Sequence, residues 1–111
     1  MSEELTEIET IIENFIKSRN WEEYHTPKSL SMSISIEAAE LMELFQWCGN
    51  KSSLEIIKNP EISEQLKGEI ADVAIYLLYL ARISNIDIIS AIKEKMAINE
   101  KRFTNTLKGG V

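Results

Sequence analysis

The sequence contains few residues that break or cross-link a chain. Its 111 residues include four glycines, two prolines and one cysteine, Cys48. A single cysteine excludes an intramolecular disulfide, and it excludes a thiolate zinc site within one chain. Glycine and proline are scarce, and nothing in the sequence resembles strand alternation between turns, which argues against a strand-rich fold. We therefore expect an all-α protein.

Long apolar runs and excess positive charge are also missing. The longest uncharged apolar run, Val73 to Ala81, is far shorter than the roughly 20 residues that cross a bilayer. The acidic N-terminus has no basic start and no apolar core of the kind found in signal peptides. The net charge of -6 argues against a nucleic-acid polymer, because phosphates need a positive surface. We expect a cytoplasmic protein without membrane or nucleic-acid polymer partners.

Apolar residues recur at helical spacing along most of the chain. We predict long helices over about 4–19, 29–47, 63–84 and 87–104, with Asp87 as the N-cap of the last. A short helix is expected from Ser52 or Ser53 to just before Pro60. A hydrophobic share of 44% and a charged share of 27% are typical of a globular protein. We treat 1–111 as a single domain with a frayed tail over about 105–111.

Two of the predicted helices are apolar on nearly every side and still carry acids. The stretch "SISIEAAELMELFQW" contains Glu37 and Glu40, and "EIADVAIYLLYLA" contains Glu69 and Asp72. Residues three apart share a helix face, so the two helices packed together would bring four carboxylates to one place. A buried carboxylate must be protonated, paired or bound to metal.

The types of ligand favour a hard cation. Neither acidic stretch contains a basic residue, and the sole histidine, His25, lies outside both. Oxygen ligands alone suit Mg²⁺, with Mn²⁺ as a substitute, and argue against redox iron or copper. Acidic pairs on helices are common and usually solvated. A non-catalytic helical oligomer, whose acids are paired or protonated, therefore stays open as an alternative.

Four stretches occur in an order typical of a known family. "NWEEYHTPKSL", "EAAELMELFQW", "EIADVAIYLLYLA" and "KMAINEKRF" resemble the MazG-like nucleoside triphosphate pyrophosphohydrolases, in particular the small all-helical dCTP pyrophosphatase type. The resemblance covers about residues 15–103. It implies a four-helix-bundle-like all-α fold and hydrolysis of a nucleoside triphosphate, such as dCTP, to the monophosphate and pyrophosphate. Nucleotide-pool sanitation is the role this suggests.

The resemblance also implies roles for individual residues. Four acids would be the catalytic and Mg²⁺-binding residues: Glu37, Glu40, Glu69 and Asp72. Trp47 would line the nucleobase pocket, and His25 and Tyr76 would contact base or sugar. Three residues near the C-terminus would face the triphosphate or sugar: Lys95, Asn99 and Arg102.

Several points stay open from the sequence. Gly68 stands where many relatives carry a second acid, which leaves the metal count undecided. Glu43 lies either on the rim of the acidic site, which we favour, or beside the attacking water. Trp21 is either packing or pocket wall. The preferred base is not predicted, and an enzyme of the same fold acting on another phosphorylated metabolite, such as phosphoribosyl-ATP, is a further alternative.

Oligomerisation is expected from the amount of apolar surface. Two nearly all-apolar helices in so short a chain have too little surrounding protein to cover them. The family resemblance implies a homodimer or homotetramer, with active sites near the subunit contacts. We expect His25 or the basic C-terminal helix of one subunit to approach the acids of another.

Overall fold

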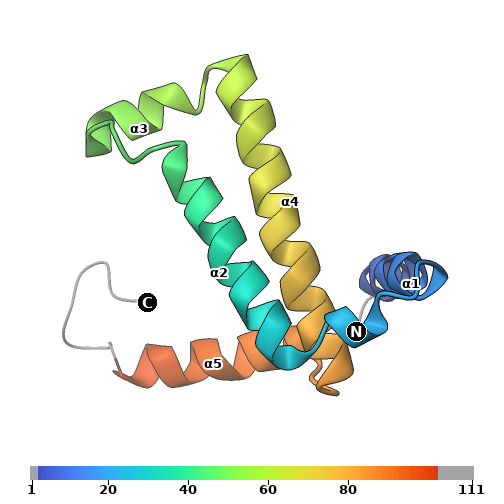
Figure 1. The fold of residues 1–111 in the computed structure, drawn as a ribbon. Helices are drawn as coiled ribbons and strands as arrows, with labels where there is room; N and C mark the ends of the chain where they lie inside the picture. Colours follow the sequence, from blue (N-terminus) through green and yellow to red (C-terminus); the bar gives the residue numbers. More distant parts are fainter. Residues whose placement is uncertain (1–2, 103–111) are drawn as a thin grey trace.

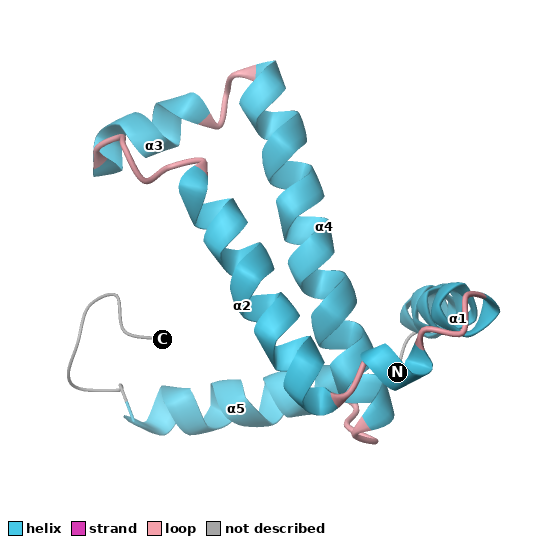
Figure 2. Ribbon diagram, viewed as in Figure 1, coloured by secondary structure: helices cyan, strands magenta, loops and turns pink. Residues whose placement is uncertain are grey.

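The computed structural model describes residues 3–102, and these are helical without any strand (Figures 1 and 2). Its elements in chain order are α1 (Glu3–Ser18), the 3₁₀ turn Glu22–Tyr24, α2 (Pro27–Glu43), α3 (Asn50–Ile56), α4 (Pro60–Ile83) and α5 (Ile88–Arg102). The predicted all-α fold class is confirmed. The predicted end of the last helix near 104 and the frayed tail lie outside the described residues.

Two of the long helices begin earlier than predicted because a capped proline starts each of them. The Thr26 hydroxyl accepts a hydrogen bond from the Ser29 backbone N–H, which caps α2. The Asn59 side chain accepts from two backbone N–H groups at the start of α4. Proline is favourable in a first helical turn, where its missing N–H would have no partner. Pro60 therefore begins α4, although the sequence prediction used it only to end the preceding helix.

The region after α2 also differs from the prediction. α2 ends at Glu43, and the Leu44 N–H tightens the last turn by bonding to the Leu41 carbonyl. Residues 44–47 form a turn instead of continuing the helix. The N-cap of α3 is Gly49, so the predicted cap at Ser52 or Ser53 is wrong. The predicted cap of α5 is confirmed, since Asp87 Oδ1 accepts from Ile89 and Ser90.

Asparagine reverses the chain direction after α1 and again after α4. Asn20 and Asn85 both have φ of 56°, in the left-handed region. The N–H of each following residue, Trp21 or Ile86, bonds back to a carbonyl five residues earlier. This is the Schellman arrangement, in which a left-handed residue ends the helix and satisfies its last carbonyls. The first of these turns brings Trp21 back toward α1.

The helices form an open arrangement rather than a closed bundle. α2 and α4 run antiparallel and side by side, while α5 leaves α4 at an angle of 100° (Figure 1). The core consists of Ile12 and Ile16 from α1, Leu30 from α2 and Tyr79 from α4. No single described helix is long and apolar enough to cross a bilayer; α4 and α5 meet that test only when taken together across their bend.

The two acid-bearing helices are not enclosed by the rest of the described chain. Only Leu30 of α2, and Tyr79 and Ala81 of α4, are buried. The expectation that these helices are buried is therefore wrong for a single chain. The reason is that α1 and α5 cover little of the α2–α4 pair, and apolar side chains such as Ile36, Met42 and Ile70 remain exposed.

Candidate functional site

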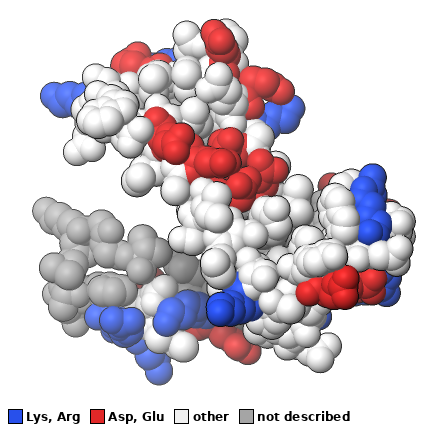
Figure 3. Space-filling view, viewed as in Figure 1, with Lys and Arg blue, Asp and Glu red and all other residues white. Residues whose placement is uncertain are grey.

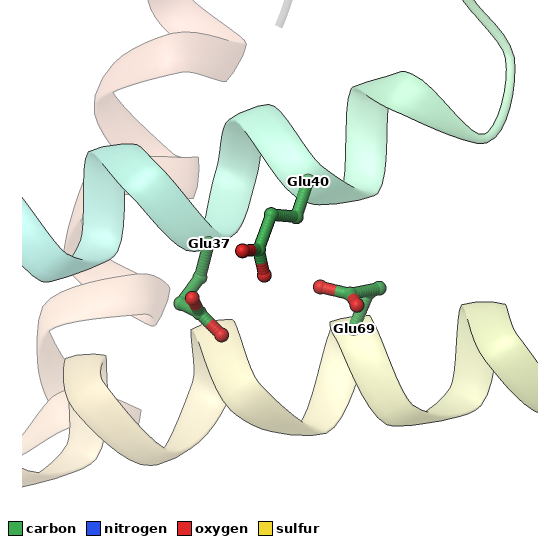
Figure 4. Close-up of side chains that lie close together, drawn as sticks. All are labelled: Glu37, Glu40 and Glu69. Carbon is green, nitrogen blue, oxygen red and sulfur yellow. The ribbon is translucent and has the colours of Figure 1, made fainter.

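Three of the four predicted acids converge between α2 and α4. Glu37 and Glu40 extend from α2 toward α4, and Glu69 extends from α4 toward them (Figure 4). One carboxylate oxygen from each residue lies within 4.8 Å of the others. The spacing of three residues puts Glu37 and Glu40 on the same face of α2. The helix pair thus concentrates negative charge on one surface of the molecule (Figure 3).

Asp72 lies beside this trio, although it is not one of the three that converge. It follows Glu69 by three residues on α4, so it shares that helix face. Its negative charge raises the pKa of both Glu37 and Glu69. Glu43 also acts on the pKa of Glu69, but its side chain is exposed. The rim location of Glu43 remains a prediction.

The surroundings of Glu37 and Glu69 disfavour the ionised form of both side chains. Partial burial is the largest cause that raises the pKa of Glu37 and of Glu69, and the charge of Glu40 is the next. Within residues 3–102 no lysine or arginine forms an ion pair with the trio. Glu69 Oε2 is buried and has no hydrogen-bond partner. Converging oxygen ligands with an unsatisfied buried atom fit a hard divalent cation.

A second feature is an aromatic pocket between α1, the 3₁₀ turn and α4. Its volume is about 270 Å³. The His25 ring lies parallel to Trp21, within 3°, and close to parallel with Tyr76, with centroids 6.4 Å apart in both pairs. The pocket is lined by Ile11, Ile12, Phe15, Ile16, Trp21, His25, Ile75, Tyr76 and Tyr79. Flat, apolar walls of this kind suit an aromatic ligand.

Two polar groups of this pocket, the His25 imidazole and the Tyr79 hydroxyl, have proton positions that follow from their surroundings. His25 Nδ1 lies 2.9 Å from the Trp21 carbonyl oxygen. A carbonyl can only accept, so the Nδ1 of a neutral His25 carries the proton and Nε2 is left as an acceptor. Burial raises the pKa of Tyr79, helped by the charges of Glu22 and Glu13. The Tyr79 hydroxyl therefore stays protonated at neutral pH.

The pocket and the acids are neighbours along α4. Tyr76 follows Asp72 by four residues, a rise of about 6 Å along the helix axis. Glu69, Asp72, Tyr76 and Tyr79 form one stripe, since their spacings are close to whole helical turns. A ligand with an aromatic end and an anionic end can therefore contact both features while lying along α4.

The other predicted site residues do not reach this region within one chain. Trp47 is 91% exposed and lies outside the aromatic pocket. Lys95, Asn99 and Arg102 belong to α5, whose basic surface lies apart from the acids (Figure 3). Their spacing puts all three on the same face of α5 as the apolar Ile92. These roles remain predictions.

Sequence reasoning missed part of the pocket wall. Phe15 and Tyr79 were not predicted to be site residues, and Trp21 was left undecided. Tyr79 follows Tyr76 by three residues, so the shared helix face was a signal that could have found it. No comparable signal existed for Phe15, because its contribution depends on how α1 meets α4.

Comparison with known proteins agrees with this geometry. Residues 32–107 match the MazG-like family. The chain belongs to this family. The match includes all four acids, all of α4 and the part of α2 from residue 32 onward.

Individual relatives span several kinds of organism. The chain is 33% identical to dCTP pyrophosphatase 1 of Rattus norvegicus over 106 residues, which cover 96% of this chain and 62% of that protein. It is 34% identical to the human protein of the same name over 99 residues, or 89% of this chain and 58% of that protein. The chain thus spans about three fifths of the length of these relatives.

Two further relatives are a phage protein and a solved structure. A dATP/dGTP diphosphohydrolase of Salmonella phage PMBT28 is 54% identical over 43 residues, 39% of this chain and 15% of that protein. A crystal structure of a pyrophosphatase from Archaeoglobus fulgidus DSM 4304 superposes with a TM-score of 0.85 at 41% identity. The superposed region covers 93% of this chain and 94% of the Archaeoglobus fulgidus chain. The shared fold therefore extends over nearly the whole chain.

Proposed function

We propose that the protein is a Mg²⁺-dependent pyrophosphohydrolase of deoxynucleoside triphosphates that acts in nucleotide-pool sanitation. The observation that carries the proposal is the convergence of Glu37, Glu40 and Glu69 next to an aromatic pocket on the same stripe of α4. The names of the relatives support the same class of substrate, since they include a dCTP pyrophosphatase and a dATP/dGTP diphosphohydrolase.

The metal would be held by Glu37, Glu40, Glu69 and Asp72. When bound, Mg²⁺ supplies positive charge that offsets the charge of the triphosphate and makes the α-phosphorus more electrophilic. The carboxylates of this chain would hold the ion between α2 and α4, and the ion would give the buried Glu69 Oε2 the partner that it lacks. A water that attacks the α-phosphorus displaces pyrophosphate, so no covalent nucleophile is required of the protein.

The aromatic pocket would receive the base. Trp21, His25 and Tyr76 offer ring faces on which a base stacks, and stacking tolerates any base. His25 Nε2 adds an acceptor for a donor group on the base or sugar. With the base beside Tyr76, the phosphates extend along α4 toward Asp72 and the acid trio.

A second copy of the chain would complete the site. The accessible surface is 8631 Å² for 12.7 kDa, about 2,400 Å² more than a compact monomer of this mass exposes. An obligate dimer interface buries an area of that order. We propose a homodimer or homotetramer in which Trp47 and the α5 residues Lys95, Asn99 and Arg102 face a partner's acids. There the basic side chains stabilise the leaving pyrophosphate.

The deciding experiment is product analysis with a panel of nucleoside triphosphates and Mg²⁺. Phosphorus NMR should show monophosphate and pyrophosphate, with a deoxynucleotide preferred over its ribonucleotide. Nucleoside diphosphate and orthophosphate as products would contradict cleavage between the α- and β-phosphates. Turnover of phosphoribosyl-ATP alone would favour the other metabolic substrate. A folded protein that consumes none of these compounds would favour the non-catalytic helical module.

A further inference from the structure

We propose that Arg19 is a positioning residue for the aromatic pocket. Its guanidinium group holds Phe15 and Trp21, which form the outer wall of the pocket, in the arrangement that receives the base. The inference rests on the proposed function of the pocket, but the clamp itself is a property of the free protein.

The contacts of Arg19 are directed at this wall. Its guanidinium carbon lies 3.6 Å from the centroid of the Phe15 ring and 5.8 Å from that of Trp21. One of its terminal nitrogens donates to the Phe15 carbonyl oxygen at 3.1 Å and to the Ser18 hydroxyl at 3.2 Å. The stacking and the hydrogen bonds together fix the plane of the guanidinium. Distances of this size place both rings within the range of cation–π attraction.

The backbone brings the partners of this clamp together. Arg19 follows the last residue of α1, and Asn20 takes up the left-handed conformation of the Schellman turn. The Trp21 N–H then bonds to the Ile16 carbonyl, so the indole returns to the helix it has just left. Trp21 meets Phe15 edge to face, with ring centroids 5.8 Å apart. The turn thus places Arg19, Phe15 and Trp21 in mutual contact.

The wall needs such a clamp because it is otherwise weakly held. Phe15 is 49% exposed and Trp21 is 41% exposed, whereas Ile12, Ile16 and Tyr79 on the inner side of the pocket are buried. Side chains that are half in solvent lose rotamer freedom when a ligand binds, and this loss lowers affinity unless they are already ordered. In a chain of net charge -6, no acid of residues 3–102 forms an ion pair with Arg19. Its contacts are made to the pocket wall instead.

The first test compares Arg19→Gln and Arg19→Lys with the wild type in steady-state hydrolysis. Glutamine removes both the charge and the planar guanidinium group. Lysine keeps the charge but not the planar group. Because a pre-organised wall contributes to binding and not to the chemical step, we expect Arg19→Gln to raise KM about three- to tenfold. The kcat value should change less than twofold, and Arg19→Lys should recover part of the loss. Lys28→Gln removes another exposed cation close in the chain and should leave both constants unchanged.

The second test needs no activity. The protein contains two tryptophans, Trp21 and Trp47, so Trp47→Phe leaves Trp21 as the only indole. In that background, Arg19→Gln should shift the emission of Trp21 to longer wavelength and increase its quenching by acrylamide. Lys28→Gln should do neither. Circular dichroism confirms that each variant is folded before it is compared.

The outcomes separate this inference from the function on which it rests. Wild-type protein without hydrolysis would contradict the proposed function, while the fluorescence would still test the clamp. An active enzyme in which Arg19→Gln leaves both KM and the Trp21 emission unchanged would overturn the role of Arg19. A loss confined to kcat would overturn it as well, because it would place Arg19 in the chemical step.

Discussion

Glu37 and Glu69 are carboxylates whose surroundings favour the protonated form. Partial burial and the neighbouring acids raise the pKa of both above the ordinary value of 4.5. A group with a raised pKa in the folded state destabilises that state once it is ionised. The cost is absent below the ordinary pKa and grows as the pH rises from 4.5 through the raised value. Metal-free protein should therefore lose stability across this interval.

This gives a prediction for Glu69→Gln, because glutamine resembles a protonated glutamate that never ionises. Without metal, the Tm of the variant should exceed that of the wild type at pH 7.5, and the difference should vanish near pH 4. Added Mg²⁺ should raise the Tm of the wild type more than that of the variant. Thermal melts over a pH series with and without EDTA provide the measurement, with the exposed Glu94→Gln as control. A variant that is less stable than the wild type at pH 7.5 without metal would refute this account of the cluster.

Tyr76 allows a matched test of base stacking. Base–aromatic stacking contributes about 1–3 kcal/mol, so Tyr76→Leu should raise KM about tenfold while the protein stays folded. Tyr24→Leu is the control, since Tyr24 lies in the adjacent 3₁₀ turn, is 64% exposed and does not line the pocket. Initial rates over a range of substrate concentrations separate KM from kcat. Equal effects of the two substitutions would count against the aromatic pocket as the base site.

The turn between α4 and α5 depends on one residue with a left-handed backbone conformation. Asn85 holds the left-handed position between α4 and α5, where a residue with a Cβ atom is strained unless it is asparagine or aspartate. We expect Asn85→Ala to lower the free energy of unfolding by about 1 kcal/mol. Asn85→Gly should be close to neutral. Urea unfolding measures both, and equal stabilities for the two variants would contradict a conformational role for this turn.

Much of the element level was predictable because it depends on local sequence. Helical spacing of apolar residues located all the long helices, and Asp87 was identified as a cap from its own position. The starts of α2 and α4 were missed because an Asn-Pro or Thr-Pro pair both ends one segment and begins the next. The end of α2 at Glu43 has no local signal, since "LFQW" would continue a helix by propensity.

The candidate site also has one part that local sequence predicts and one part that depends on contacts between distant segments. The acid pairs follow from a spacing of three residues within a helix, and the antiparallel packing of α2 and α4 brings Glu37, Glu40 and Glu69 together. The aromatic pocket depends on contacts between α1 and α4, whose lining residues, up to Ile16 and from Ile75 onward, are at least 59 positions apart in the chain. A single sequence carries no direct signal for such a contact, which is why Phe15 was missed.

At the scale of the whole molecule, a single chain leaves apolar helix surface exposed to solvent. α5 exposes Ile92 and Met96 to solvent, and they lie one turn apart on the side of the helix that also carries Lys95 and Asn99. We expect the double variant Ile92→Glu and Met96→Glu to shift the protein toward monomers and to reduce hydrolysis at least tenfold, because a partner supplies part of the site in the proposed oligomer. Lys101→Glu adds a similar charge on the opposite side of α5 and should do neither.

Light scattering coupled to size exclusion gives the mass of each variant, and the hydrolysis assay is run at the same protein concentration. A wild-type monomer with full activity would contradict the proposed completion of the site by a second copy. A double variant that stays oligomeric and active would remove α5 from the interface.

The most direct test of the central claim is Mg²⁺-dependent pyrophosphate release by the wild type beside Glu40→Gln, Glu69→Gln and Asp72→Asn, with Glu94→Gln as control. If the acids between α2 and α4 hold the catalytic metal, each of the three substitutions should lower kcat by about a hundredfold or more. The control should keep the wild-type rate, and EDTA should abolish release in both active proteins. Full release by any of the three folded variants, or release that persists in EDTA, would contradict a metal-dependent reaction at this cluster.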